Sequence, residues 1–513
     1  MFDFSASTRC NTILDRERPL FPRINKTKEI FFIREDQTID SNLHDFELLF
    51  FWNCAFVFLL IYIYIHTFMQ QIHIFCLFCL LFTNDLIADE IWLVNFSRTT
   101  ENQLLLIEES FPFIDLLESN PLKSTYVFLL RHDDRTRFAR FLSENNGSYR
   151  RLPNKILKSS TKRSKRWTPS EHPLDRTYYQ HFLSYDEQRD WHQLLENSPL
   201  TKRFVRIHTI GQSYENRSLE VIELHTRRYP RRRRKHAVYI DGGMHAREWL
   251  SIGVANYIIV QFLREKKTNP KIQEIFRHFD VFVLPMMNPD GYEYSRTKNR
   301  LWRKNRSPTS HSEFWNGDEN CMGIDLNRNF PHQWHSLPSS SMYACTTSYR
   351  GPQPSSEPEV LHVVNFLKRL TYPHPKFHAY FNLHAYGRFW LLPWAYTSFE
   401  RVSNYDNLFE RSNRIMTTVM NGTYKVGQAS RLLYPCSGTS IDYAATLMPH
   451  SMTFELSPAF SILPMCTEND SALDETCTVG FMMGPDAIEI DGKEIFTAIV
   501  EYLYSVVQDS FSE

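Results

Sequence analysis

The sequence predicts an α/β protein from Trp167 onward, preceded by a much smaller α/β layer. Short apolar stretches typical of buried strands alternate with stretches of helical periodicity. The strand candidates are 218–224, 238–240, 281–284, 377–383 and 451–456, and the clearest helix candidates are 250–264 and 495–507. At 513 residues the chain has room for one enzyme domain of roughly 300 residues and a second of about 80.

Residues 89–166 form the smaller layer. Residues 91–94 and 126–130 are its predicted strands, and 103–117 and 135–142 are its predicted amphipathic helices. A polar, basic stretch follows and ends in Arg163, Lys165 and Arg166, a pattern typical of sites cleaved by furin-like convertases. A solvated basic linker is the alternative interpretation.

The N-terminal part of the chain contains an apolar segment, 48–82, that is almost free of charge. We favour a signal peptide at 69–88, which leaves 1–68 as an upstream extension that is not part of the mature protein. The alternative is a retained membrane anchor within 48–82, and only this alternative attaches the protein to a membrane. Both interpretations export everything that follows, and we expect a secreted protein.

Cysteine and charge content agree with an exported protein whose function depends on a specific site. Lys plus Arg and Asp plus Glu both total 58, so no charge bias indicates a nucleic acid or anionic membrane partner. The odd number of downstream cysteines predicts up to two disulfides and one free thiol. Their spacing favours pairing of Cys321 with Cys345 and of Cys466 with Cys477, and leaves Cys436 free. Glycosylation sequons, usable only after export, occur at Asn95, Asn146, Asn216, Asn305, Asn421 and Asn469.

A second basic run, 227–235, lies between two predicted strands. We favour a solvated hairpin loop over a polyanion site or a second processing site, because cleavage there would sever the strand pair.

A candidate metal site follows the strand at 238–240. His245 and Glu248 are three positions apart, and His384 ends the strand at 377–383. Two imidazoles and one carboxylate are the ligands of one common type of catalytic zinc site, in which a further position stays open for water. A single histidine at a strand end is more often structural. Here, however, other reactive groups also follow strands, and side chains at the carboxyl ends of strands gather at one edge of an open α/β sheet.

Six separated motifs occur in the order typical of one enzyme family. They are His-Ala-Arg-Glu-Trp at 245–249, Asn-Pro-Asp-Gly-Tyr at 288–292, Arg-Leu-Trp-Arg-Lys at 300–304, Gly-Ile-Asp-Leu-Asn-Arg-Asn at 323–329, Leu-His-Ala-Tyr at 383–386 and Thr-Phe-Glu-Leu at 453–456. With them the chain resembles the funnelin metallocarboxypeptidases, the carboxypeptidase A/B family, over about 178–507. Residues 92–151 are more weakly similar to the activation propeptide of that family.

The resemblance implies an architecture and a processing scheme. It implies a mixed central sheet flanked by helices at 167–513, preceded by a small open-sandwich α+β propeptide at 89–166. The propeptide would cap the active site as an inhibitor, and a furin-like protease would activate the zymogen by cutting after Arg166. Substrates would be the C-termini of peptides or proteins.

The resemblance also implies a role for each candidate site residue. His245, Glu248 and His384 would hold one Zn²⁺, with Asp325 orienting an imidazole from behind. Glu455 would be the general base and proton shuttle, and Arg303 would stabilise the oxyanion. The substrate-binding residues would be Asn327 and Arg328 at the terminal carboxylate, Tyr434 closing over the bound end, and Arg247 and Tyr386 further from the cut.

Specificity is expected to follow from Ile441, which stands where B-type enzymes carry an acid. An aliphatic floor offers no partner for a cation, so hydrophobic or aromatic C-terminal residues would be preferred. Leu391, Ala395, Ala429, Leu433 and Thr453 would complete the wall. Pro435 and Cys436 depart from the usual pattern.

A different class of function is a secreted binding or matrix protein that kept the fold and lost catalysis. That hypothesis predicts the loss of Glu455, Arg303 or a zinc ligand, and all of them are present.

Overall fold

The structure, a computed structural model, describes most of the chain from Glu90 onward. The described stretches are 90–96, 106–107, 110–111, 114–120, 125–152, 168–226, 235–309, 321–335, 339–372, 378–459 and 480–511. The expected upstream extension, the signal peptide or anchor, the cleavage residues Arg163, Lys165 and Arg166, and the cysteines Cys466 and Cys477 lie outside these stretches. Within them, no helix combines the length and the apolar character needed to cross a bilayer.

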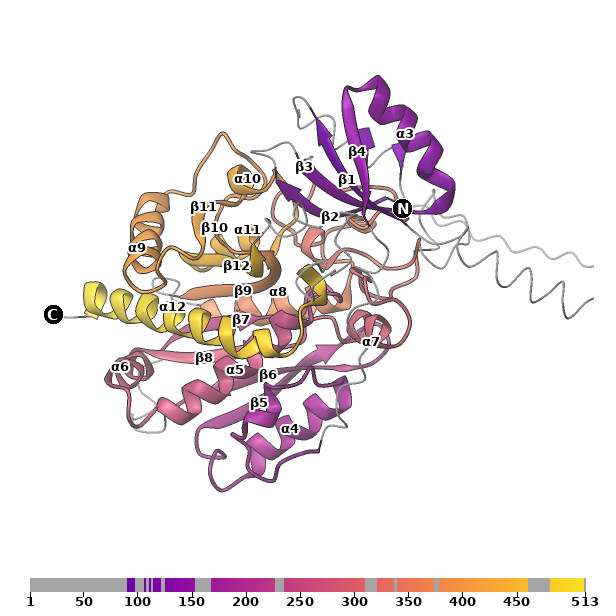
Figure 1. Cartoon of the computed structure of the whole chain (residues 1–513). Helices are drawn as coiled ribbons and strands as arrows, with labels where there is room; N and C mark the ends of the chain where they lie inside the picture. The colour runs from indigo at the N-terminus through magenta and orange to yellow at the C-terminus, as the bar shows by residue number, and fades with distance from the viewer. Residues whose placement is uncertain are drawn as a thin grey trace, which may run out of the picture. The chain divides into compact units, whose positions relative to one another are not determined.

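The described residues between Glu90 and Leu152 include a small antiparallel sheet with helix α3 beside it (Figure 1). The strand order is β2 (Asp115–Asn120), β3 (Thr125–Leu130), β1 (Glu90–Phe96) and β4 (Gly147–Leu152), and the helix is α3 (Arg135–Glu144). Along β1, Trp92 and Val94 pack with Phe138 of α3, whereas Ile91 and Leu93 join the main core of the chain. The small sheet therefore packs against the larger domain.

The prediction for this layer was incomplete. It contains four strands instead of two, and the helix predicted to reach residue 117 is wrong at its end, because β2 begins at Asp115. Pro112 gives the physical reason, since proline lacks the amide hydrogen that a helix interior needs and clashes with the preceding turn.

The larger domain is built on a mixed sheet, as predicted, and eight of the described strands form it. Its order is β11-β10-β12-β9-β7-β8-β6-β5, and the central strands β12, β9, β7 and β8 run parallel. The strands are β5 (Val205–Gln212), β6 (Ser218–Leu224), β7 (His236–Asp241), β8 (Phe279–Leu284), β9 (Ala379–Gly387), β10 (Phe389–Leu392), β11 (Lys425–Gln428) and β12 (His450–Ala459).

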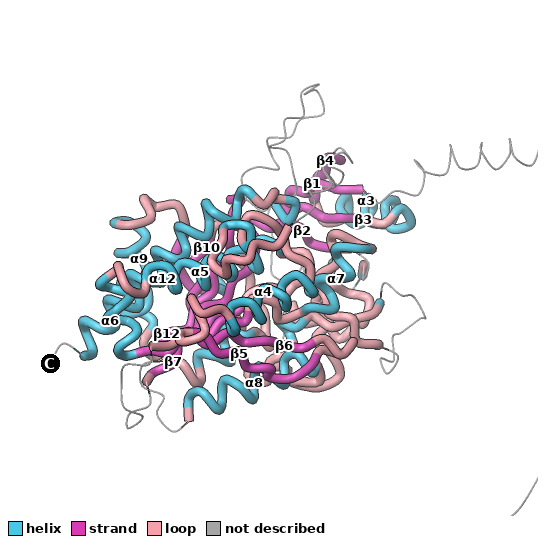
Figure 2. Tube along the Cα trace, turned by 90° about the horizontal axis from the view of Figure 1, so that it is seen from below, coloured by secondary structure: helices cyan, strands magenta, loops and turns pink. Residues whose placement is uncertain are grey.

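Helices pack on both faces of this sheet (Figure 2). Val238 and Ile240 of β7 belong to a core shared with α5 and α12, whereas Ala237 and Tyr239 pack with α8 and α11 on the other face. Alternate side chains of one strand are thus buried on opposite faces, as in a strand covered on both sides. The helices are α4 (Tyr185–Asn197), α5 (Trp249–Glu265), α6 (Pro270–His278), α7 (Pro289–Thr297), α8 (Pro358–Thr371), α9 (Tyr405–Thr418), α10 (Ala429–Leu432), α11 (Ser440–Ala445) and α12 (Asp486–Phe511).

The predicted hairpin around the second basic run is wrong. β6 pairs with β5 and β8, and β7 pairs with β8 and β9, so β8 lies between β6 and β7. Two strands that are consecutive in the chain do not have to be neighbours in a sheet, and the sequence of the intervening run does not report pairing. Residues 227–234 themselves lie outside the described stretches.

Two smaller predictions have clear outcomes. The disulfide between Cys321 and Cys345 is present, and among the cysteines that the structure describes Cys436 is free. The sequon at Asn305 is not a usable glycan acceptor in the folded protein, because Asn305 is fully buried and its amide donates to Glu357 and Glu359.

Glu359 is a buried carboxyl whose ionisation should make stability depend on pH. It accepts hydrogen bonds from the Tyr214 amide and from Asn305, both at 3.2 Å. Burial raises the pKa of Glu359 to about 8, and the neighbouring Glu357 adds to this. A glutamate in the unfolded chain has a pKa of about 4.3. The folded state therefore binds the proton more tightly, and its stability falls as pH rises through the interval between these two values.

We expect Glu359→Gln to remove this pH dependence. The stability of the variant is compared with that of the original chain at each pH. This difference in the free energy of unfolding should grow in favour of the variant between pH 5 and pH 8. The growth is at most about 1.4 kcal/mol for each pH unit that lies between the unfolded and the folded pKa of Glu359. Urea unfolding at both pH values measures it, with the exposed Glu410→Gln as the matched control. An identical change in the two variants would show that Glu359 is ionised in the folded protein.

Candidate functional site

The central parallel strands bring the candidate site together at their carboxyl ends. β9 and β12 are paired so that His384 lies directly opposite Glu455. β7, on the other side of β9, ends at Asp241, and the chain then passes through His245 and Glu248 before α5 begins. β9 runs on to Gly387, so His384 lies within this strand and not at its end. Segments far apart in the sequence therefore meet at one edge of the sheet.

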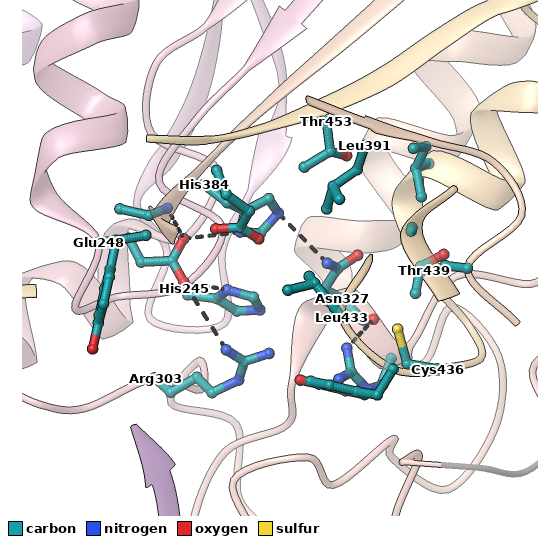
Figure 3. A pocket seen from close by; sticks show the side chains of 18 of the residues that line it. His245, Glu248, Arg303, Asn327, His384, Leu391, Leu433, Cys436, Thr439 and Thr453 are labelled. Carbon is teal, nitrogen blue, oxygen red and sulfur yellow. Dashed lines mark hydrogen bonds and ion pairs between the residues drawn. The ribbon is translucent and has the colours of Figure 1, made fainter. Parts of the chain in front are cut away.

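His245, Glu248 and His384 form a compact buried cluster (Figure 3). The Nδ1 atom of His245 lies 2.7 Å from one oxygen of Glu248, and the Nδ1 atom of His384 lies 2.8 Å from the other. One ligand atom from each residue lies within 4.8 Å of the others, and among the described residues this is the group of three that could hold a metal ion. Two imidazole nitrogens and one carboxylate oxygen are a donor set that zinc prefers, so the cluster fits a zinc ion.

Asp325 supports this cluster from behind. Its carboxylate lies 3.1 Å from the Nε2 atom of His245 and accepts hydrogen bonds from Arg303 Nε at 3.0 Å and Arg303 Nη2 at 2.9 Å. Burial alone would raise the pKa of Asp325, but Arg303, His245 and Arg328 together hold this pKa well below its usual range. Asp325 is therefore an anion that fixes the orientation of the His245 ring.

The loop after β7 takes its shape from glycine and asparagine. Gly243 has a positive φ of 64°, and a side chain at Gly242 would lie 2.8 Å from the backbone oxygen of Ser251. Asn288 donates to the backbone oxygens of Met244 and Lys304, both at 3.1 Å, and so ties this loop to the segment that carries Arg303. Asn288 is therefore a positioning residue. The sequence analysis included it in a motif but assigned no role to it.

Glu455 lies across from the metal cluster and is partly buried. Burial raises its pKa to about 8; Glu248 adds to the increase, while His384 and Arg303 oppose it. A carboxyl with so high a pKa in the absence of a metal is poised to exchange protons near neutral pH.

All of the candidate catalytic, metal and substrate residues except Asp325 line one cavity. The cavity, whose empty volume including space open to solvent is about 860 Å³, is lined among others by His245, Arg247, Glu248, Arg303, Asn327, Arg328, His384, Tyr386, Tyr434, Ile441 and Glu455. Asp325 lies directly behind this wall. Every other expected catalytic, metal or substrate residue that the structure describes lies in the wall of this cavity.

Asn327 and Arg328 lie on a short helical turn at Leu326–Arg328 that the Asp325 side chain caps. The Asn327 side-chain oxygen accepts the Ser440 amide at 2.9 Å, and Arg328 donates through Nε to the Ser339 backbone oxygen at 2.5 Å. Both polar groups are therefore held in place by protein contacts before any substrate is bound.

An apolar recess opens from the same cavity. Leu391, Ala395, Ala429 and Ile441 form one buried cluster, against which Leu433 and Cys436 pack. Asp442, the acid next to Ile441 in sequence, accepts the backbone amides of Ala395 at 2.7 Å and Tyr396 at 2.9 Å. Its carboxylate is thus engaged with the backbone behind the recess.

Several residues in or next to the cavity had no assigned role in the sequence. Thr439 lies in the recess, Phe481 follows the undescribed stretch 460–479, and Leu116 comes from β2 of the small sheet. Asp115, the neighbour of Leu116, forms a buried ion pair with Arg247. Nothing in the sequence of residues 115–116 signalled this contact, because one acid and one leucine in a strand carry no pattern.

The comparisons with known proteins agree with the geometry. A family described as zinc carboxypeptidase matches residues 191–498. Carboxypeptidase A6 of Homo sapiens is 33% identical over 343 residues, which are 64% of this chain and 74% of that protein. Carboxypeptidase A2 of Rattus norvegicus is 34% identical over 271 residues, 50% of this chain and 61% of that protein. A crystal structure of thrombin activatable fibrinolysis inhibitor superposes with a TM-score of 0.64 at 25% identity, covering 82% of this chain and 99% of that one.

The chain therefore belongs to the zinc carboxypeptidase family. It is a metallocarboxypeptidase of the A type, a hydrolase that acts on the C-termini of peptides and uses zinc. The predicted family, fold and cofactor are confirmed, and the cluster of His245, Glu248 and His384 fits that cofactor.

We expect the chain to bind one zinc ion per molecule, and His384→Ala to lower the affinity by more than about a hundredfold because it removes one of three ligand groups. The metal content after dialysis and the rise in Tm on adding zinc measure this effect, since a ligand that binds only the folded state raises its stability.

His192→Ala is the matched control. His192 is also buried and lies 2.8 Å from a carboxylate, that of Glu220, but neither residue lines the cavity. Its variant should keep the zinc-dependent rise in Tm. Equal zinc binding by the two variants would exclude His384 as a ligand.

Proposed function

We propose that this protein is a secreted zinc exopeptidase that removes one C-terminal residue, prefers hydrophobic or aromatic residues, and is made as a zymogen cleaved after Arg166. The observation that carries the proposal is the convergence of His245, Glu248 and His384 with Glu455, Arg303 and a carboxylate clamp on one cavity.

We assign the metal to His245, Glu248 and His384. A zinc ion held there would lower the pKa of a bound water and polarise the scissile carbonyl. Asp325 would keep the His245 ring in the orientation that presents Nδ1 to the metal, because it lies 3.1 Å from the opposite nitrogen.

Glu455 is the proposed proton carrier. It takes a proton from the attacking water and later delivers it to the nitrogen of the leaving residue, so it must be ionised in the resting enzyme. A nearby dication would lower the pKa of Glu455 from about 8, which favours the ionised form at neutral pH.

Arg303 is the proposed donor to the oxyanion that develops on the scissile carbonyl. Its Nε and Nη2 atoms bind Asp325, and Nη1 lies 4.0 Å from a Glu248 oxygen. The guanidinium is therefore fixed beside the metal cluster before the charge appears, which is the condition for electrostatic stabilisation of a transition state.

Asn327 and Arg328 form the proposed clamp for the terminal carboxylate of the substrate. Both line the cavity, and both are held by Asp325 and by the surrounding backbone. A guanidinium and an amide that bind a carboxylate select a chain terminus, so the enzyme would remove one residue and not cut internally. Tyr434 would cover the bound end, and Arg247 and Tyr386 would contact residues before the cut.

The apolar recess is the proposed specificity pocket. Ile441 is 4% exposed and packs with Leu391, Ala395 and Ala429, and the carboxylate of Asp442 is engaged with backbone amides. A Lys or Arg side chain would lose its water there without gaining a partner, which is costly. A hydrophobic or aromatic side chain would gain from burial.

A scan of the C-terminal residue tests the function. We expect the zinc-loaded chain, cleaved after Arg166, to release Phe or Leu from blocked dipeptides at least about a hundredfold faster than Arg or Lys, because burial of an unpaired cation is so unfavourable. A chelator should abolish the release, and Glu455→Gln should lower kcat by about a hundredfold or more.

The outcomes of the scan are distinct. Arg released faster than Phe would overturn the pocket assignment. Inactivity of zinc-loaded, cleaved protein toward every substrate would favour the alternative function, a secreted binding or matrix protein that kept the fold.

Residues 89–166 are the proposed inhibitory propeptide. Leu116 of β2 lines the cavity, and Asp115 pairs with Arg247, which is only 2% exposed while the small sheet is in place. The proposed furin-like cut after Arg166 would separate this layer from the enzyme. The disulfide between Cys321 and Cys345 supports an oxidising, extracellular setting.

We expect Asp115→Asn to weaken inhibition in the uncut chain. Removing one partner of a buried ion pair leaves an uncompensated charge and costs about 3 kcal/mol or more, so residual activity on a blocked dipeptide should rise at least about tenfold. Asp133→Asn, at an exposed acid of the same layer, is the control. Equal residual activity in the two variants would show that the Asp115 pair does not hold the propeptide in place.

A further inference from the structure

The proposed carboxylate clamp is held from behind by a loop outside the cavity, residues 339–350, which we call the clamp loop. The backbone oxygen of Ser339 accepts a hydrogen bond from Arg328 Nε at 2.5 Å, and the backbone oxygen of Tyr349 accepts the Asp325 amide at 2.8 Å. These two oxygens lie near the two ends of the clamp loop. The position of the Arg328 guanidinium in the cavity therefore depends on where this loop lies.

The middle of the clamp loop, at Ala344 and Cys345, is fastened to residues that follow Arg303 in the chain. Cys345 forms the disulfide with Cys321, and Lys304 donates from Nζ to the Ala344 backbone oxygen at 2.7 Å. One attachment is covalent and the other is a charge-assisted hydrogen bond, and they act on consecutive residues. Lys304 thus connects the backbone next to the proposed oxyanion donor with the loop behind the proposed clamp.

Hydrogen bonds and packing within the clamp loop allow it to transmit this hold. The Ser341 amide donates to the Ser348 backbone oxygen at 3.1 Å, so the two arms of the loop are joined. Ala344 packs with Tyr349 of the loop and with Ile324, the residue before Asp325, in a small buried cluster. A displacement at the middle of the loop therefore reaches both of its ends.

Burial of the Lys304 ammonium is by itself unfavourable. The residue is only 3% exposed, and burial lowers its pKa to about 7; Asp325 opposes this change, whereas Arg306 contributes to it. An apolar side chain of similar length would avoid the desolvation of a charge, so stability alone does not explain a lysine at this position. What the ammonium supplies, and an apolar side chain cannot, is one directed hydrogen bond to the clamp loop.

We propose that Lys304 is a positioning residue for substrate binding. It holds Ala344 and with it the clamp loop, and the Ser339 oxygen in turn keeps the Arg328 guanidinium aimed at the terminal carboxylate of the substrate. The disulfide at Cys345 is the second attachment of the same loop. This inference rests on the proposed function, because it assumes that Arg328 binds that carboxylate.

Two inhibitors of the same size test this role in the zinc-loaded chain after cleavage at Arg166. Hydrocinnamate carries a carboxylate for the clamp, whereas hydrocinnamyl alcohol has a neutral hydroxyl in its place. Their inhibition constants are measured against the release of Phe from a blocked dipeptide. We expect Lys304→Met to weaken hydrocinnamate about tenfold and the alcohol less than about twofold, because only the carboxylate depends on the aim of a guanidinium.

The kinetic constants of the same variant give a second readout. The clamp would contact the terminal carboxylate in the bound substrate and in the transition state alike, so its misplacement should raise KM about tenfold and change kcat less than about threefold. The Tm should change little, because the variant loses one buried hydrogen bond but also removes a buried charge. A purely structural role would lower Tm and leave KM unchanged.

Lys235→Met is the matched control. Lys235 is also largely buried and donates to a backbone oxygen, that of Phe276 at 2.9 Å, but it does not line the cavity. Its variant should keep KM and both inhibition constants. Arg328→Gln is the reference for a lost clamp and should weaken hydrocinnamate at least as much as Lys304→Met does. If Lys304→Met does not fold, Lys304→Gln replaces it, because this shorter polar side chain also loses the contact with Ala344.

The results separate the inference from the function on which it rests. Unchanged KM in the Lys304 variant, or equal weakening of the two inhibitors, would overturn the positioning role and leave the carboxypeptidase function intact. Unchanged binding of hydrocinnamate in Arg328→Gln would overturn the clamp assignment and the inference with it. No release of Phe by the original chain would contradict the proposed function itself.

Discussion

The buried carboxylate of Asp325 holds together the groups on which the site depends. It faces His245 Nε2, accepts two hydrogen bonds from Arg303, and caps the helical turn that carries Asn327 and Arg328. Without it, two guanidinium groups and an imidazole would lie close together with no anion behind them, which a buried site does not tolerate. One negative charge thus fixes the candidate metal ligand, the proposed oxyanion donor and the proposed carboxylate clamp relative to one another, so a displacement of one would displace all of them.

The sheet supplies the second level of positioning. Parallel pairing sets Glu455 opposite His384, and the hydrogen-bonded register leaves no freedom for either to slide, because a shift by one residue would turn both side chains to the other face. β7 and β9 in turn bring Glu248 to His384, with the Ala385 amide donating to a Glu248 oxygen at 3.1 Å. The proposed proton carrier and the candidate metal cluster are therefore aligned by backbone hydrogen bonds.

The sequence predicted those strands and site residues that a pattern within a short stretch of the chain is enough to identify. β6 was predicted with its observed bounds, and the motifs around His245, Asp325, His384 and Glu455 pointed to the candidate site, because each motif places a reactive side chain in a turn or next to apolar strand residues. The short strands β10 and β11 escaped prediction, since four residues carry no measurable periodicity. Strand pairing could not be predicted from these local patterns either, since β8 lies between β6 and β7. The ion pair of Asp115 with Arg247 joins residues that are 132 positions apart, so it also depends on tertiary packing.

Arg247 physically links the small sheet to the wall of the cavity. Its guanidinium pairs with Asp115 and lies against the Phe481 ring, so one buried charge is shared between the two layers. In the proposed zymogen, covalent attachment would give Asp115 a high effective concentration at this guanidinium. The proposed cut after Arg166 would remove that advantage without altering the cavity wall, so one cut would be enough to let the small sheet leave and to uncover Arg247.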